Sequence, residues 1–143
     1  MLLITFGLIT FAFAHSSMPA DVSTEESESV TLFLQKILQA LGFTAELTDH
    51  IVRKSAHFAE FSAIGAMLLS SAYTFNKSRP QKYYFQVLFV GLMTAVIDEA
   101  IQLNVVGRSG QITDVLLDFS GVLVGSIFML IAFAIYRRVR KIK

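Results

Sequence analysis

Ionisable and amide side chains gather in the stretch from Asp98 to Gly125, which joins two strongly apolar segments that otherwise contain almost no charge. Among them are Asp98, Glu99, Gln102, Arg108, Asp114 and Asp118. An arginine can bind a carboxylate or a phosphate through two parallel hydrogen bonds, and carboxylates can orient a base or bind a cation. A charge near the centre of a bilayer costs about 2.5–3.5 kcal/mol on insertion scales. We therefore expect these groups to serve a site.

A second polar group precedes this stretch and has the spacing of one helix face. Arg53, His57 and Glu60 follow each other at i, i+4 and i+7, which places them on one stripe. Lys54 lies beside that stripe, and it is a candidate partner for the carboxylates, as are Arg53 and Arg108. Neutral imidazole is a common general base, so His57 is the candidate base if the protein catalyses a reaction. The sequence does not decide whether it does.

The composition is that of an integral membrane protein with a single domain over residues 1–143. The chain has 143 residues, of which 54% are hydrophobic and only 16% charged, against about a quarter charged in soluble domains. The absence of cysteine excludes disulfides, thiolate metal sites and cysteine nucleophiles. No nucleotide-binding glycine loop or HExxH motif occurs. The basic residues lie beside apolar segments, where a membrane explains them, so we expect no nucleic-acid partner.

Apolar runs predict an all-α bundle of about four transmembrane helices. The expected spans are approximately 1–14, 56–75, 83–103 and 115–136. The first run is shorter than the roughly 20 residues that a spanning helix needs. Ala12-Phe13-Ala14 resembles a signal-peptide cleavage site, so this run is a short span, a truncated span or a secretory signal. No lysine or arginine precedes it, which favours a span. The oligomeric state stays open.

The segment between the first two spans is expected to contain one loop and one short helix. His15–Ser29 is rich in serine and acidic residues and predicts a solvated loop. Residues 30–41 have apolar side chains at helical spacing, with Ser29 as the expected cap and Gly42 near the end. Twelve residues are too few to span, so we expect an amphipathic helix on the membrane surface or over the bundle. Thr44 is the expected cap of the next helix.

The distribution of basic residues predicts the orientation. Eight of the twelve lysines and arginines lie in two segments without acids: Lys77, Arg79 and Lys82 in the loop 76–82, and Arg137, Arg138, Arg140, Lys141 and Lys143 in the C-terminal tail. An even number of spans separates the two segments, so both lie on one side. The positive-inside rule makes that side cytoplasmic. Both polar groups then lie on the extracytoplasmic side.

This topology brings both groups to the outer ends of three helices. We call the expected ligand-binding residues the polar cluster: Arg53, Lys54, His57, Glu60, Asp98, Glu99, Gln102, Arg108, Asp114 and Asp118. No metal or cofactor is predicted, because a histidine among carboxylates can hold a divalent ion but no recognised ligand spacing occurs. Gly121 and Gly125 form a GxxxG pattern that predicts close helix packing. Gly107 and Gly110 are expected to shape the turn around Arg108.

The segments RKSAHFAEFSAIGAML and DEAIQLNVVGRSGQITDVLLDFSGVLVG resemble the VanZ-like family of small bacterial membrane proteins. The resemblance runs from about Phe11 to Gly125. Its most specific parts are Lys54-x-x-His57, Asp98-Glu99-x-x-Gln102, Gly107-Arg108 and Asp114. The chain departs from the family pattern at Asp118, where asparagine is usual, at Val106, where proline is common, and at Phe61, where tyrosine is frequent.

The resemblance implies a four-helix protein of the bacterial cytoplasmic membrane, in a family whose name-giving member is linked to resistance to the glycopeptide antibiotic teicoplanin. We expect a cell-envelope protein that binds an outer-leaflet ligand, either a lipid-linked wall precursor or a lipoglycopeptide. An intramembrane enzyme acting on a lipid-linked envelope substrate is the alternative. In a third hypothesis the polar cluster only locks three helix ends together, and function lies in a partner protein.

Overall fold

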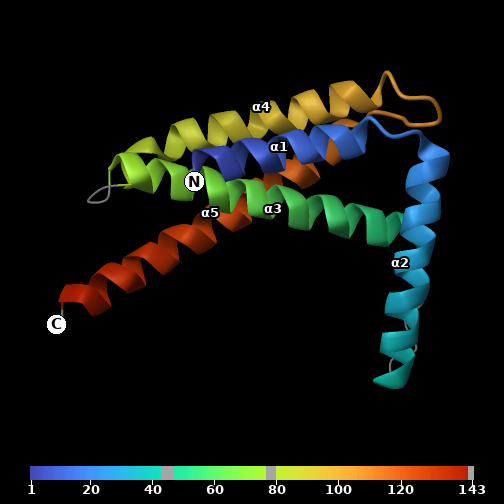
Figure 1. Ribbon diagram of the computed structural model, residues 1–143, viewed down its shortest axis with the longest axis horizontal. Helices are drawn as coiled ribbons and strands as arrows, with labels where there is room; N and C mark the ends of the chain where they lie inside the picture. Colours follow the sequence, from blue (N-terminus) through green and yellow to red (C-terminus); the bar gives the residue numbers. More distant parts are fainter. Residues whose placement is uncertain (43–46, 77–79, 142–143) are drawn as a thin grey trace.

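The computed structural model describes residues 1–42, 47–76 and 80–141, and within these ranges the chain is helical with short connections and no strand. The helices are α1 (Leu2–Ser16), α2 (Ala20–Ala40), α3 (Asp49–Phe75), the short 3₁₀ helix η1 (Pro80–Tyr83), α4 (Tyr84–Gln102) and α5 (Ile112–Lys141) (Figure 1). The all-α prediction is confirmed. Helix α3 runs without interruption through both the polar and the apolar part of the predicted second span.

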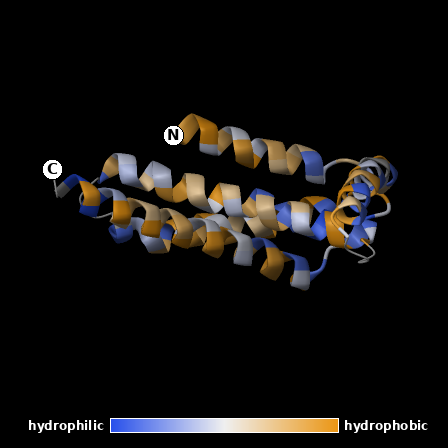
Figure 2. Cartoon of the chain, turned by 90° about the horizontal axis from the view of Figure 1, so that it is seen from below, coloured by the Kyte–Doolittle hydropathy of each residue, from blue (hydrophilic) through white to orange (hydrophobic). Residues whose placement is uncertain are grey.

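Helix α3 is the centre of the bundle, since it contacts α1, α2, α4 and α5. Figure 2 shows the long helices lying side by side, with α2 seen nearly end-on at one end of the bundle. The buried core joins Ala12 of α1, Phe61 and Ile64 of α3, Ala95 of α4 and Val122 of α5. Because α3 has neighbours on several sides, its polar residues can be satisfied by protein and need not face lipid.

Glycines bring α3 and α5 into backbone contact. A Cβ atom built on Gly121 would lie 2.6 Å from the Phe58 carbonyl oxygen, and one on Gly125 would overlap the Ser62 carbonyl oxygen. The GxxxG prediction is therefore confirmed, since only glycine permits this approach. The close crossing sets the register of the two helices, and polar residues near the start of α5 come to lie beside the first turns of α3.

Two helices are long and apolar enough to cross a membrane, Gln81–Gln102 and Ile112–Arg140. They correspond to the predicted third and fourth spans. Helix α1 has 15 residues, or about 22 Å, against a hydrocarbon core of about 30 Å. It meets the same test only together with α2, from which it is bent by 110°. Helix α3 is not among the candidates, so the count of four spans stays a prediction.

The predicted solvated loop His15–Ser29 is wrong, because α1 continues through Ser16 and α2 begins at Ala20. The physical reason is visible in the side chains of α2. The hydroxyls of Thr24 and Ser27 each donate to the carbonyl four residues earlier, at 2.7 and 2.8 Å. These bonds satisfy short polar side chains within a helix. A serine-rich sequence that reads as a loop can therefore be the packed side of a helix.

The ends of the second and third helices correct two predicted caps. Ser29 lies inside α2, whose N-cap position is Pro19, whereas Gly42, with φ +83°, follows the end of α2 as expected. Thr44 lies outside the described residues. The N-cap of α3 is Thr48, whose hydroxyl accepts a hydrogen bond from the Ile51 backbone N–H at 3.3 Å. Lys77, Arg79 and Lys143, which support the predicted orientation, also lie outside the described residues.

Candidate functional site

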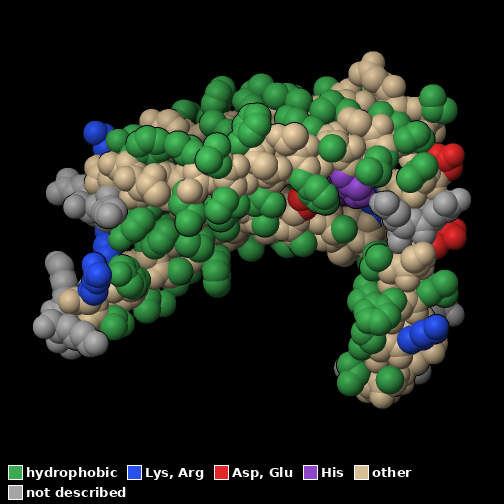
Figure 3. Space-filling view, in the orientation of Figure 1, with side chains coloured by type: hydrophobic (Ala, Val, Ile, Leu, Met, Phe, Trp, Pro, Cys, Tyr) green, Lys and Arg blue, Asp and Glu red, His purple; other side chains and the backbone are tan. Residues whose placement is uncertain are grey.

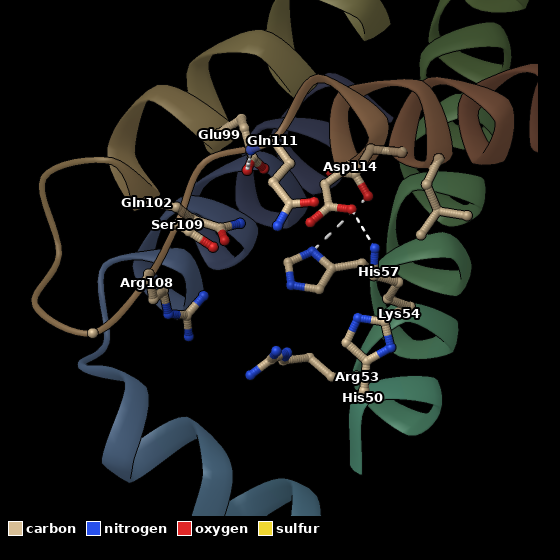
Figure 4. A pocket seen from close by; sticks show the side chains of 13 residues that line it. His50, Arg53, Lys54, His57, Glu99, Gln102, Arg108, Ser109, Gln111 and Asp114 are labelled. Atoms are coloured by element: carbon tan, nitrogen blue, oxygen red, sulfur yellow. Dashed lines mark hydrogen bonds and ion pairs between the residues drawn. The ribbon is translucent and has the colours of Figure 1, made fainter. Parts of the chain in front are cut away.

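A cavity of about 240 Å³ opens at the end of the bundle where α2 is attached. It is lined by the first turns of α3, the end of α4, the loop between α4 and α5, and the start of α5 (Figure 4). Eight members of the polar cluster line it: Arg53, Lys54, His57, Glu99, Gln102, Arg108, Asp114 and Asp118. The structure therefore brings together residues that are far apart in the sequence. The other two members, Glu60 and Asp98, do not line the cavity.

Asp98 is completely buried, and two donors hold one of its oxygens. Its Oδ2 accepts a hydrogen bond from Ser16 Oγ at 2.7 Å and another from Gln102 Nε2 at 3.0 Å. Its Oδ1 is buried without a hydrogen-bond partner. The bond from Gln102 follows from the four-residue spacing seen in the sequence. Ser16 was missed, because no local pattern links residues that are 82 positions apart.

His57 lies next to Asp118, with 4.0 Å between Nδ1 of the imidazole and Oδ1 of the carboxylate. Asp118 is 2% exposed, and its Oδ1 has no hydrogen-bond partner. The imidazole also lies near His15 at the end of α1, with ring centroids 6.2 Å apart. The carboxylate that departs from the family pattern is therefore the one nearest to the candidate base.

Lys54 and Asp114 form the ion pair that joins α3 to α5, with 2.5 Å between Nζ and Oδ1. This confirms the expected pairing for Lys54. Glu99 turns to the backbone instead, and its Oε1 accepts a hydrogen bond from the Gln111 N–H at 2.6 Å. The sequence could not predict this role of Gln111, since almost any residue type has a backbone N–H that can donate.

The two arginines of the polar cluster face the same cavity. Figure 4 shows the guanidinium groups of Arg53 and Arg108 directed toward one another across the open space. Among the side chains that the structure describes, neither forms an ion pair. Arg108 donates from Nη2 to the His15 carbonyl oxygen at 3.5 Å, and its Nε is buried without a partner. The expected pairing of both arginines with carboxylates is therefore not found.

Burial lowers the pKa of the Arg108 guanidinium from its ordinary value, and the charge of Arg53 adds to this effect. The positive charge of Arg108 is thus held in an unfavourable place. The loop is shaped for this by Gly107, which has φ +80°, a conformation that favours glycine. The predicted role of Gly107 in the turn is confirmed. An anion between the two arginines would offset both the desolvation and the repulsion.

The family model described as VanZ/LLP1 matches residues 1–134. The chain belongs to the VanZ/LLP1 family. No curated protein and no solved structure matches this chain. In this VanZ/LLP1 protein the whole cavity lies inside the matched region, and so does the GxxxG contact.

The family departures of this VanZ/LLP1 protein have different structural meanings. Phe61 is fully buried in the core, where an added hydroxyl would need a partner. Val106 is exposed, and its carbonyl oxygen accepts a hydrogen bond from the Ala20 N–H at 3.4 Å. Only Asp118 changes the charge at the cavity.

Proposed function

We propose that this protein binds an anionic headgroup of an outer-leaflet ligand in the cavity at the α2 end of the bundle. The observation that carries the proposal is the pair Arg53 and Arg108, two guanidinium groups that face one cavity and form no ion pair with a carboxylate that the structure describes. Guanidinium groups match phosphate and carboxylate oxygens through paired hydrogen bonds. The binding residues are those of the polar cluster that line the cavity, and Asp98 supports Gln102 among them by accepting its hydrogen bond.

The charges at the two ends of the molecule support an extracytoplasmic position for this cavity. Lys82 at η1 and the arginines near the end of α5 lie at the bundle end opposite the cavity (Figures 1 and 3). The positive-inside rule favours the cytoplasm for such an end. We therefore propose a four-span protein of the bacterial cytoplasmic membrane, with its polar cluster facing outward and its C-terminal tail inside.

The size of the cavity favours a headgroup over a whole ligand. Pockets for drug-sized molecules have about 300–1,000 Å³, so about 240 Å³ suits a phosphate or carboxylate with its first neighbours. The remainder of the molecule would lie in the outer leaflet. A lipid-linked wall precursor and a lipoglycopeptide both have an anionic group next to a lipid anchor. If the protein binds the lipoglycopeptide, less of the antibiotic reaches the wall precursors, and the cell gains resistance to teicoplanin.

Binding to the purified protein in lipid nanodiscs tests the proposal. The probes are a radiolabelled lipid-linked wall precursor and a lipoglycopeptide, each measured separately. Arg53→Gln and Arg108→Gln should each weaken binding about 10- to 100-fold, because a hydrogen bond to a charged group contributes about 1.5–3 kcal/mol. Arg140→Gln is the matched control, since Arg140 lies over the Tyr136 ring at the opposite end, 5.4 Å from its centroid. Equal binding by the natural protein and Arg108→Gln would contradict the proposal.

Expression in a susceptible host tests the biological consequence. Teicoplanin and vancomycin are used separately, because only teicoplanin has a lipid anchor. Protection against teicoplanin alone, lost on Arg108→Gln and His57→Gln, would support binding of the lipoglycopeptide. Protection that survives Arg108→Gln would show that the cavity does not cause the resistance.

An intramembrane enzyme acting on a lipid-linked envelope substrate is the second candidate. The observation in its favour is the short distance between the imidazole of His57 and the buried carboxylate of Asp118. A carboxylate next to a histidine can orient it as a general base. Turnover of a lipid-linked substrate in vesicles, abolished by His57→Gln while binding and folding survive, would establish this function. Binding without turnover would exclude the enzyme and support the binding function.

A further inference from the structure

Three side chains from three different helices converge behind the arginines. His57 of α3, Asp98 of α4 and Asp118 of α5 each offer one donor atom, and these atoms all lie within 4.8 Å of one another. Atoms bound to one Zn²⁺ at about 2.0–2.2 Å lie roughly 3–4 Å apart. The three donor atoms would therefore have to move toward one another by about 1 Å to bind one ion.

Two oxygens in this group have no partner although they are buried. Asp98 is 0% exposed and Asp118 is 2% exposed, and the Oδ1 atom of each lacks a hydrogen bond. A buried polar atom without a partner costs about 1–3 kcal/mol, and more when it is charged. Ser16 and Gln102 already hold Oδ2 of Asp98, so its free oxygen has a defined position. This arrangement resembles the outer hydrogen bonds that orient metal-binding carboxylates.

The charge balance around the group favours a cation. The polar cluster has five carboxylates against three basic side chains, and one of the three, Lys54, is paired with Asp114. Arg53 and Arg108 face the cavity, whereas Asp98 lies behind it. Buried negative charge in excess is costly, and a divalent ion offsets it directly.

We propose that His57, Asp98 and Asp118 bind a divalent transition-metal ion of the Zn²⁺ class. An imidazole nitrogen suits zinc and its transition-metal neighbours, whereas magnesium and calcium prefer oxygen alone. Three protein ligands leave a fourth position open. That position faces the cavity, because both His57 and Asp118 line it. The sequence predicted no metal, since the three ligands are on separate helices and have no motif spacing.

The inference stands apart from the proposed anion binding, because the metal is measured alone. The full-length protein in nanodiscs is stripped with a chelator, dialysed and titrated with Zn²⁺, Mn²⁺ or Mg²⁺, and the bound metal is counted by elemental analysis. We expect one Zn²⁺ for each chain, with Mg²⁺ bound at least 100-fold more weakly. Asp118→Asn and His57→Gln should each weaken Zn²⁺ binding at least 10-fold. Asp21→Asn on exposed α2 is the matched control and should bind as the natural protein does.

Cobalt supplies a readout that does not depend on stability. Co²⁺ bound by one nitrogen and two carboxylates should give a visible absorption spectrum that is lost in His57→Gln and kept in Asp21→Asn. Arg108→Gln should keep the metal while losing the anionic ligand, which separates the two proposals. Folding of each variant is checked by helical circular dichroism and gel filtration. Less than 0.2 Zn²⁺ for each folded chain at saturation, or equal Zn²⁺ affinity in Asp118→Asn, would overturn the metal site.

Discussion

At the scale of single residues, Asp98 shows how the cavity is held in place. The carboxylate is buried at the end of α4, and Ser16 reaches it from the end of α1. A hydrogen bond to a charged group inside a protein contributes about 1.5–3 kcal/mol. The short helix α1 therefore has a direct part in the site, although none of its residues lines the cavity.

Ser16→Ala should leave Asp98 with Gln102 as its side-chain donor. We expect a loss of about 1–3 kcal/mol in stability, because a buried charge loses one of its two partners. Ser17→Ala is the matched control, since the Ser17 hydroxyl is exposed and donates to the Phe13 carbonyl oxygen four residues earlier. Thermal unfolding in detergent measures both variants. Equal midpoints would show that Ser16 does not stabilise Asp98.

At the scale of helices, the contact between α3 and α5 decides which side chains meet. Glycines at the crossing allow the two backbones to touch, so Asp114 reaches Lys54 and Asp118 approaches His57. Such crossings occur between helices that lie in membranes, where small residues replace a hydrophobic driving force. The geometry of the cavity therefore depends on glycines that contribute no side chain to it.

Gly125→Ala should force α3 and α5 apart, because its Cβ would overlap the Ser62 carbonyl oxygen. Overpacking typically costs about 1–3 kcal/mol, and contact with rigid backbone places this variant at the upper end. Gly7→Ala on α1 is the matched control, since a Cβ there meets nothing within 4 Å. Alanine is favoured over glycine in helices by about 1 kcal/mol, so the control should be neutral or slightly more stable. Thermal unfolding in detergent measures both variants. Equal unfolding midpoints for Gly125→Ala and Gly7→Ala would contradict the predicted destabilisation.

Helix α2 presents an exposed apolar side that suits the membrane surface. Its angle of 110° to α1 turns it away from the bundle (Figure 1), and Phe33 and Ile37 are exposed on it at helical spacing. A helix of this kind can lie in the interface with its apolar side toward the acyl chains. Its length and angle come from the structure, and its position on the membrane stays a prediction.

A single tryptophan can test the position of α2, because the chain contains none. Phe33→Trp should show blue-shifted emission in vesicles and quenching by brominated lipid, since it lies on the apolar side. Leu32→Trp is the matched control, because Leu32 and Phe33 are both 64% exposed and Leu32 lies on the side of Lys36. Equal quenching of the two variants would contradict an interfacial orientation.

At the scale of the whole molecule, the two ends differ in charge. The cavity and its carboxylates lie at one end, and η1 and the basic end of α5 lie at the other (Figure 3). This separation predicts a single insertion direction.

Cysteine labelling in whole cells tests that direction, because the chain has no cysteine of its own. Ser109→Cys, in the loop at the cavity, should react with a membrane-impermeant maleimide from outside. Arg140→Cys, near the end of α5, should react only after the membrane is permeabilised. The opposite pattern would place the cavity in the cytoplasm and remove the proposed outer-leaflet ligand.

The sequence by itself determined the helical class, the family, the positions of α4 and α5 and the eight predicted polar residues that line the cavity. These features depend on local information: apolar run length, helical spacing and the separation of charges along the chain. The pairing of Gln102 with Asp98 belongs here, because residues four apart share one helix face. The same local reasoning failed at α2, where short polar residues form the packed side of a helix.

Only the tertiary structure decided which polar groups meet and which remain unsatisfied. Ser16 reaches Asp98 over 82 positions, the two arginines face one cavity, and His57, Asp98 and Asp118 converge from three helices. None of these contacts has a sequence signature, because each depends on how closely the helices pack. The glycine crossing of α3 and α5 sets that distance, and with it the chemistry that the cavity can perform.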